Sequence, residues 1–191
     1  DGDDNTAIGS NALRNFEPAD GSSYNTAVGS QAGFTVTTGV RNTLIGGLSG
    51  YAMTTGDRNV AVGATSLDAC TEGQYNVAVG NDALTTLTTG DRNTAVGLQA
   101  GAAITTGSDA GDATTTASFN TAVGESALSA NTTGYSNVAV GNQSLIANTT
   151  GANNTATGRY ALYAATTASN NTALGLQTLF ANTTGANNTA V

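Results

Sequence analysis

Hydrophobic and polar positions recur along this chain with a fixed period. The string Asn-Thr/Val-Ala-Val-Gly returns every 17 residues over most of the sequence. With its Asn as position one, the unit reads Asn-Thr-Ala-Val-Gly-x-x-Ala-Leu-x-Ala-x-Thr-Thr-Gly-x-x. A repeat of fixed length is typical of an array in which each unit packs on its neighbours. The eleven units begin at Asn5, Asn25, Asn42, Asn59, Asn76, Asn93, Asn120, Asn137, Asn154, Asn171 and Asn188.

Two units are longer than the others. The first spans 20 residues, and the sixth spans 27 residues because it contains a ten-residue insertion at 108–117. The units that follow keep the 17-residue spacing. We therefore expect one repeat domain over residues 1–191, with residues 108–117 leaving the array as a surface loop.

The residue types favour strands over helices. Gly occupies position five in every complete unit and position fifteen in most units, and Gly destabilises a helix interior by about 1 kcal/mol relative to Ala. Thr and Val favour strands, and Gly permits the positive φ that a corner needs. We expect two short strands per unit and an all-β fold, a parallel β-solenoid of about eleven coils. Ten steps of about 4.8 Å would make a rod roughly 50 Å long.

Strand alternation assigns side chains to two faces. We expect positions two and four to point into the coil and to meet the Leu that recurs at position nine. Position three is Ala in every unit except at Leu44, and we expect this column to form a flat outer face through which three chains pack as a homotrimer. The adjacent Thr residues at positions thirteen and fourteen should face opposite ways, one inward and one outward.

The Asn at position one forms a column of its own. Stacked Asn side chains lie about 4.8 Å apart, so each amide can donate to the carbonyl of the next Asn in a ladder. Alternatively each Asn closes a turn, because Asn tolerates the left-handed conformation. Both interpretations are structural. The predicted structural ladder consists of Asn25, Asn42, Asn59, Asn76, Asn93, Asn120, Asn137, Asn154 and Asn171.

Composition excludes several classes of function. The net charge is −8, all five cations are Arg, and His and Lys are absent. A chain without a basic patch is not expected to bind nucleic acid. The chain also has no run of about 18 apolar residues, so we expect no membrane insertion of this segment. Without clustered acid–base groups we expect no enzyme and no cofactor. The single cysteine, Cys70, falls in the mostly apolar column at position twelve, so we expect a buried, inert thiol.

Few residues suggest a metal or modification site. Calcium needs only oxygen ligands, and the candidate acids are Asp1, Asp3 and Asp4, and Asp109 and Asp112 in the insertion. Neither group matches a calcium loop, so we expect no metal site. Asn-x-Thr sequons could carry glycans, although an Asn- and Thr-rich repeat produces them by itself. The six sequons lie at Asn131, Asn148, Asn153, Asn170, Asn182 and Asn187.

The columns that differ most between units should face outward, since packing does not dictate them. They are positions six, seven, ten, sixteen and seventeen, and they hold several aromatic residues that could stack on glycans. As candidate surface contacts we single out Tyr135 and Tyr160, together with Asp109 and Asp112 of the insertion. The other aromatic residues noted in these columns are Phe34, Tyr51, Tyr163 and Phe180.

The motif resembles a known class of repeat. Residues 76–80 and 137–141, both Asn-Val-Ala-Val-Gly, resemble the Ser-Val-Ala-Ile-Gly repeat of trimeric autotransporter adhesin heads. The stretch 120–151 is similar to repeats of bacteriophage tail-fibre proteins. This resemblance implies a left-handed parallel β-roll that assembles as a homotrimer. It also implies an adhesive fibre segment at the cell surface or on a virion, with rigid reach and contact with a glycan or protein receptor.

Two other functions remain open from the sequence. A solenoid with outward Thr columns could bind ice or another crystal surface. The adjacent Thr pair argues against this function, because ice-type faces need two outward Thr residues separated by one inward residue. A filament-forming subunit without a receptor is the other alternative.

Overall fold

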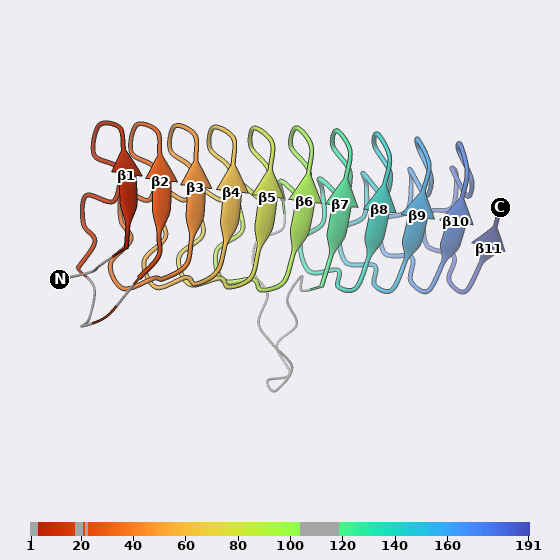
Figure 1. Ribbon diagram of the computed structural model, residues 1–191. Coiled ribbons are helices and arrows are strands. Elements are labelled where there is room, and N and C mark those ends of the chain that lie inside the picture. The colour runs from red at the N-terminus through yellow and green to blue at the C-terminus, as the bar shows by residue number, and fades with distance from the viewer. Residues whose placement is uncertain (1–3, 18–20, 22, 104–118) are drawn as a thin grey trace.

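The structure, a computed structural model, describes residues 4–17, 21, 23–103 and 119–191. Eleven parallel strands lie side by side in one sheet in sequence order, and the described residues form no helix. The coils stack into a rod with β1 at one end and β11 at the other (Figure 1). These observations confirm the parallel β-solenoid. The strands are β1 (Thr6–Ile8), β2 (Thr26–Val28), β3 (Thr43–Ile45), β4 (Val60–Val62), β5 (Val77–Val79), β6 (Thr94–Val96), β7 (Thr121–Val123), β8 (Val138–Val140), β9 (Thr155–Thr157), β10 (Thr172–Leu174) and β11 (Thr189–Ala190).

Each strand pairs with the same three positions of the next unit. Ala61 lies opposite Ala78, and the strands on either side of the long unit keep this register, with Ala95 opposite Ala122. The sheet therefore continues past the insertion at 108–117, which itself lies outside the described residues. Because equal positions stack, every residue type in the repeat becomes a straight column along the rod.

Among the described residues, each coil contains one strand rather than the two that we expected. The strand covers positions two to four, and turns make up most of the remaining coil. These turns are held by bonds between coils, as where the Leu67 amide donates to the Ala83 carbonyl at 3.0 Å. Left-handed residues at positions seven and nine, such as Asp82 (φ 55°) and Leu84 (φ 51°), interrupt the extended backbone. A second strand cannot form through such residues.

The strand faces are the reverse of our expectation. The Ala column at position three is buried, as are the Asn residues at position one, whereas positions two and four lie half-buried or exposed. Alternation places positions one and three on the same face, and the Asn side chains bond within the coil interior. The space between the sheet and the Leu column at position nine thus accepts the methyl group of Ala. Val and Thr point outward.

Leu44 supports this account of the interior. It is the single non-Ala residue at position three, and it is fully buried. Position nine is Gly rather than Leu in that coil and in the preceding one, at Gly50 and Gly33. A Cβ atom would lie 2.8 Å from the Leu44 Cδ1 atom at Gly33 and 2.7 Å from its Cδ2 atom at Gly50. The large side chain therefore fills volume that Leu occupies in other coils.

The two Gly columns serve different purposes. At position five the backbone has a positive φ, for example 137° at Gly80, as expected for a corner. At position fifteen none of the described Gly residues has a positive φ, so that part of our expectation is wrong. There the next coil approaches closely, since a Cβ atom on Gly56 would lie 2.6 Å from the Gly73 carbonyl oxygen, although one coil has Ala168 at this position.

Candidate functional site

The Asn column links each coil to its neighbours. The Asn76 amide donates to the Asn59 Oδ1 atom at 2.9 Å, and the Asn76 Nδ2 group donates to the same oxygen at 3.2 Å. The Nδ2 group also donates to the Gly90 carbonyl of its own coil at 2.7 Å. This Asn therefore stacks the coils, as the ladder predicts, and it also closes the coil on itself. The closure is made by a side-chain bond to position fifteen and not by a left-handed turn, since Asn76 has no positive φ. Its burial leaves it no contact with a ligand.

A second, shorter ladder of Asn side chains was not predicted from the sequence. Position twelve is apolar in the coils of Val36, Met53, Cys70 and Leu87, but Asn131 and Asn148 occupy it further on. The Asn148 Nδ2 group donates to the Asn131 Oδ1 atom at 2.8 Å. The ladder stops at Ala165, which leaves the buried Asn148 Oδ1 atom without a donor.

The burial of this second ladder also divides the Asn-x-Thr sequons into buried and exposed ones. Asn131 and Asn148 have no exposed surface, so a glycan cannot attach to either one in the folded chain. Asn153, Asn170 and Asn187 at position seventeen are exposed. The structure thus separates sequons that the sequence presented as equivalent.

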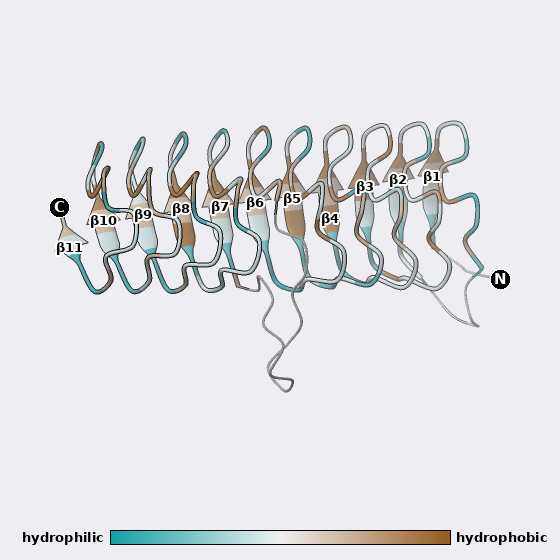
Figure 2. Ribbon diagram, turned by 180° about the vertical axis from the view of Figure 1, so that it is seen from behind, coloured by the Kyte–Doolittle hydropathy of each residue, from teal (hydrophilic) through white to brown (hydrophobic). Residues whose placement is uncertain are grey.

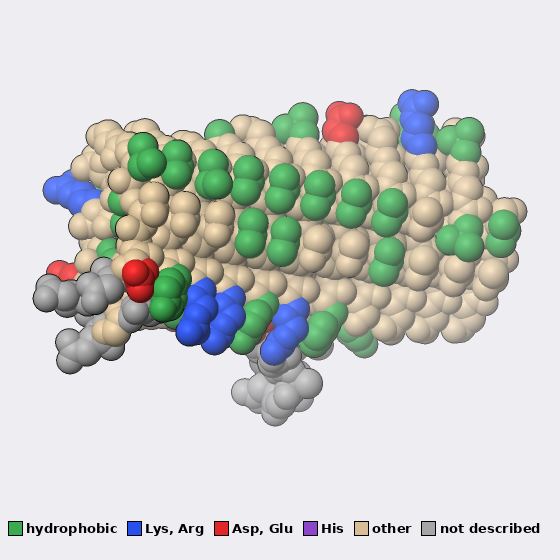
Figure 3. All heavy atoms as spheres, viewed as in Figure 1, with side chains coloured by type: hydrophobic (Ala, Val, Ile, Leu, Met, Phe, Trp, Pro, Cys, Tyr) green, Lys and Arg blue, Asp and Glu red, His purple; other side chains and the backbone are tan. Residues whose placement is uncertain are grey.

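Two outward columns cover the exposed face of the sheet. Position two holds Thr or Val throughout, and position four holds Val, Ile, Leu or one Thr, so neither column contains a charged residue. Exposure at position four reaches 60% at Ile8 and is 38% at both Ile45 and Leu174. Figure 3 shows position four as a straight apolar row along the rod. Strands β4, β5 and β8, which read Val-Ala-Val, are hydrophobic along their whole length (Figure 2). We call these two columns the sheet face.

A row of cations and aromatic rings borders the sheet face. Position seventeen, which precedes the buried Asn, turns outward with a positive φ, for example 56° at Arg58. Over six coils this column contains only aromatic residues and Arg, and all of them are exposed. Figure 3 shows this row of blue and green side chains along the lower edge of the molecule. We call it the Arg–aromatic stripe; its members are Tyr24, Arg41, Arg58, Tyr75, Arg92 and Phe119.

The stripe is held together by contacts between coils. The Arg58 guanidinium lies 5.2 Å from the centre of the Tyr75 ring, and the Arg92 guanidinium lies 5.4 Å from it. The Arg58 Nη1 group also donates to the Tyr75 hydroxyl at 2.9 Å. These residues were not among the surface contacts predicted from the sequence, although they share position seventeen of the repeat.

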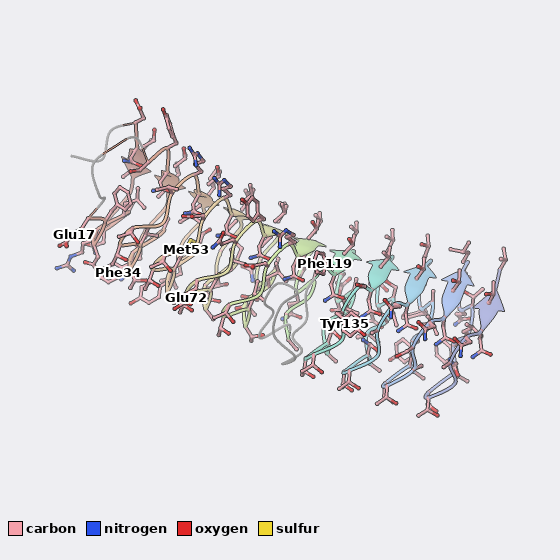
Figure 4. All side chains as sticks on the ribbon, turned by 90° about the horizontal axis from the view of Figure 1, so that it is seen from below. Glu17, Phe34, Met53, Glu72, Phe119 and Tyr135 are labelled. Carbon is pink, nitrogen blue, oxygen red and sulfur yellow. The ribbon has the colours of Figure 1, made fainter. Side chains whose placement is uncertain are left out.

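The surface residues singled out from the sequence do not come together. Tyr135 is exposed at position sixteen, and Tyr160 lies at position seven, at a different corner of the coil. Tyr160 instead joins a cluster in which the Tyr163 and Phe180 rings stack at 4.9 Å. Parallel rows of side chains run along the underside of the rod, with Phe119 and Tyr135 on successive coils (Figure 4). Asp109 and Asp112 lie outside the described residues.

Cys70 offers no chemistry. It is fully buried at position twelve, and burial raises the pKa of its thiol to about 12. The thiol is therefore protonated at neutral pH, and the nucleophilic thiolate does not form.

The described part of the chain contains no group of three or more acidic or cysteine side chains placed to hold a metal ion. Since these residues form no helix, no membrane-spanning helix occurs among them. Comparisons with protein-family models, curated proteins and solved structures gave no match to this chain.

Proposed function

We propose that this chain is a segment of a rigid extracellular fibre, in a phage tail fibre or a bacterial surface adhesin, that assembles as a homotrimer. The observation that carries the proposal is the sheet face, an uncharged, straight surface that runs the length of the rod. Its position-four column is an apolar row along the rod, and soluble monomers rarely expose a long apolar row that no partner covers. A second and a third copy of the same rod have the shape and the polarity to cover it.

The internal structure suits a load-bearing spacer. Strand register is kept from β1 to β11, and the buried Asn ladder adds side-chain bonds at nearly every step. Bending the rod would stretch these bonds on one side. A fibre made from such coils holds its ends apart without a large globular core.

The structure changes the basis of the predicted trimer. We expected the Ala column at position three to form the contact surface, but that column is buried. Positions two and four take its place as the outward side of the sheet. Their β-branched side chains pack closely on a pleated surface and lose little rotamer freedom when another rod covers them.

The first test is the assembly state. We expect light scattering of the chain to give three times the mass of one chain, and X-ray scattering to give a rod about 50 Å long. The double variant Val62→Lys/Val96→Lys places two cations on the sheet face and should yield a monomer of the same length, because a buried unpaired charge is costly.

The matched control is Thr150→Lys/Thr184→Lys, which adds the same charge at two exposed Thr residues of position fourteen. It should remain trimeric. A wild-type chain that stays monomeric at micromolar concentration, or a control that dissociates as readily as the sheet-face variant, contradicts the trimer.

Ice-surface binding is a second candidate, favoured by the same sheet face. The adjacent Thr residues of positions thirteen and fourteen do not divide into one inward and one outward column as we expected, because no described Thr at either position is buried. Positions two and four, however, are two outward columns separated by one inward residue. They make a two-dimensional array of hydroxyl and methyl groups with steps of about 4.8 Å along the rod and about 6.8 Å along the strand.

Thermal hysteresis distinguishes the two candidates. If the sheet face binds ice, the wild-type chain should be monomeric and should depress the freezing point below the melting point. The Val62→Lys/Val96→Lys variant should lose this effect, while Thr150→Lys/Thr184→Lys should keep it. A stable trimer without hysteresis excludes ice binding, because assembly would cover the array.

A further inference from the structure

We propose that the Arg–aromatic stripe binds a linear polysaccharide that carries sparse carboxylate or sulfate groups and lies along the rod. This inference rests on the proposed extracellular fibre function, for which it supplies the class of receptor. The stripe gathers three of the five cations of a chain whose net charge is −8. Since position seventeen becomes Ser136 and then Asn in later coils, the binding surface is confined to the first six coils.

Two of the three guanidinium groups of the stripe, those of Arg58 and Arg92, are positioned before any ligand arrives. Arg58 and Arg92 come from the coils on either side of Tyr75, and each lies over its ring within 5.4 Å of the centre. The bond from Arg58 to the Tyr75 hydroxyl at 2.9 Å fixes one of them further. Stacked guanidinium groups keep N–H donors at their edges for a carboxylate or sulfate. Less side-chain entropy is then lost on binding.

Adjacent cations make an anion favourable at one end of the stripe. Arg41 and Arg58 occupy successive coils, about 4.8 Å apart along the rod, and both side chains are exposed. Their mutual repulsion is relieved when an anionic group lies between them. Arg92 follows Arg58 by two coils, roughly 9.6 Å, which is close to the length of a disaccharide in an extended chain.

Neighbouring acids limit the charge density of the partner. Asp57 and Asp91 lie at position sixteen, beside Arg58 and Arg92. Asp57 Oδ1 accepts the Val40 amide at 2.8 Å, and Asp91 Oδ1 accepts the Gln74 amide at 2.6 Å. Both carboxylates are thus directed partly toward the backbone, but their charge remains. A polymer with widely spaced acidic groups fits this surface better than one with a charge at every unit.

These features favour a polysaccharide over single-stranded nucleic acid. Proteins bind unpaired bases by stacking them on open aromatic faces, and the Tyr75 ring already has a guanidinium from each neighbouring coil. The net charge of −8 also repels a phosphate backbone. What the stripe offers are guanidinium edges and the Tyr24 and Tyr75 hydroxyls, which suit acidic groups and sugar hydroxyls.

The test is a calorimetric titration of the full chain with hyaluronan oligosaccharides, which carry one carboxylate per disaccharide. Neutral dextran serves as the uncharged polymer. We expect binding to hyaluronan that weakens as salt is added, and none to dextran. Arg41→Gln and Arg58→Gln should each lower the affinity about tenfold, the value of one charge-assisted hydrogen bond. Arg58→Lys should lie between wild type and Arg58→Gln, because it keeps the charge and loses the planar fork.

Arg159→Gln is the matched control. Arg159 also lies over a tyrosine, 4.5 Å from the Tyr160 ring centre, but at position six, away from the stripe. Its removal changes the net charge by the same amount and should leave the affinity unchanged. The proposal is overturned if Arg159→Gln weakens binding as much as Arg58→Gln does, or if dextran binds equally well. Tighter binding of single-stranded DNA than of hyaluronan of equal length also overturns it.

Two measurements on the same samples separate this proposal from the fibre function. If Arg58→Gln disturbs folding through its contact with Tyr75, a melting curve detects it, and Arg41→Gln decides the outcome. A trimeric rod that fails to bind hyaluronan refutes the stripe as a polysaccharide site and leaves the fibre function standing. A monomeric chain that binds hyaluronan through the stripe refutes the trimer alone.

Discussion

Gly46→Ala is expected to lower the melting temperature by about 10 °C or more, which corresponds to a loss of about 3 to 5 kcal/mol in the free energy of unfolding. Gly46 has φ 134°, a conformation that residues with a Cβ atom rarely adopt. A Cβ atom at this position would also collide with the Gly63 carbonyl group of the next coil. Because that neighbour is backbone in a paired coil, it cannot move without breaking the stack.

Gly47→Ala is the control for this prediction. Gly47 follows Gly46 directly, but a Cβ atom there meets nothing within 4 Å. We expect this variant to change stability by no more than about 0.5 kcal/mol. Thermal denaturation followed by circular dichroism measures both. Equal melting temperatures for the two variants would contradict the assignment of position five as the corner that requires Gly.

Asn76→Ala is expected to cost about 3 to 5 kcal/mol, since several buried hydrogen bonds are lost together. The Asn93 amide loses the Asn76 Oδ1 acceptor at 3.0 Å, and the Gly90 carbonyl loses its Nδ2 donor at 2.7 Å. Neither the Asn93 amide nor the Gly90 carbonyl can form a hydrogen bond with water instead, because the Asn column is buried. Chemical denaturation measures the change, and limited proteolysis shows whether the rod opens at this coil.

Asn81→Ala is the matched control in the same coil. The Asn81 side chain is exposed and donates to Asp82 Oδ2 at 2.6 Å. Its removal should change stability by less than about 0.5 kcal/mol. A similar effect of the two variants would show that the buried column adds nothing beyond ordinary surface hydrogen bonds.

The repeat itself predicted the solenoid, its coil boundaries and the stacking of equal positions. A 17-residue unit with a fixed Asn leaves one register in which every Asn meets another Asn, and the strands pair in that register. The burial of Cys70 and of the Leu column at position nine also followed from their neighbours in the columns.

The candidate site was harder to predict from the sequence than the fold. The Arg–aromatic stripe could have been found by reading down position seventeen, but its contacts depend on how side chains from successive coils meet. Tyr135 and Tyr160 were predicted as surface contacts from their residue type, and they lie at different corners of the coil. Variation at a repeat position predicts that its side chains are exposed. It does not predict which other repeat positions lie beside them on the surface.

The sequence by itself determined the period, the parallel stacking and the column that each residue joins, because these depend on the order of residues alone. The tertiary structure decided which way each column faces. That choice depends on how the coil closes, and closure depends on left-handed residues such as Asp82 and Leu84, which the strand alternation does not reveal. The closed coil is narrow, so Ala and hydrogen-bonded Asn fill its sheet side, and Val and Thr form the outer surface.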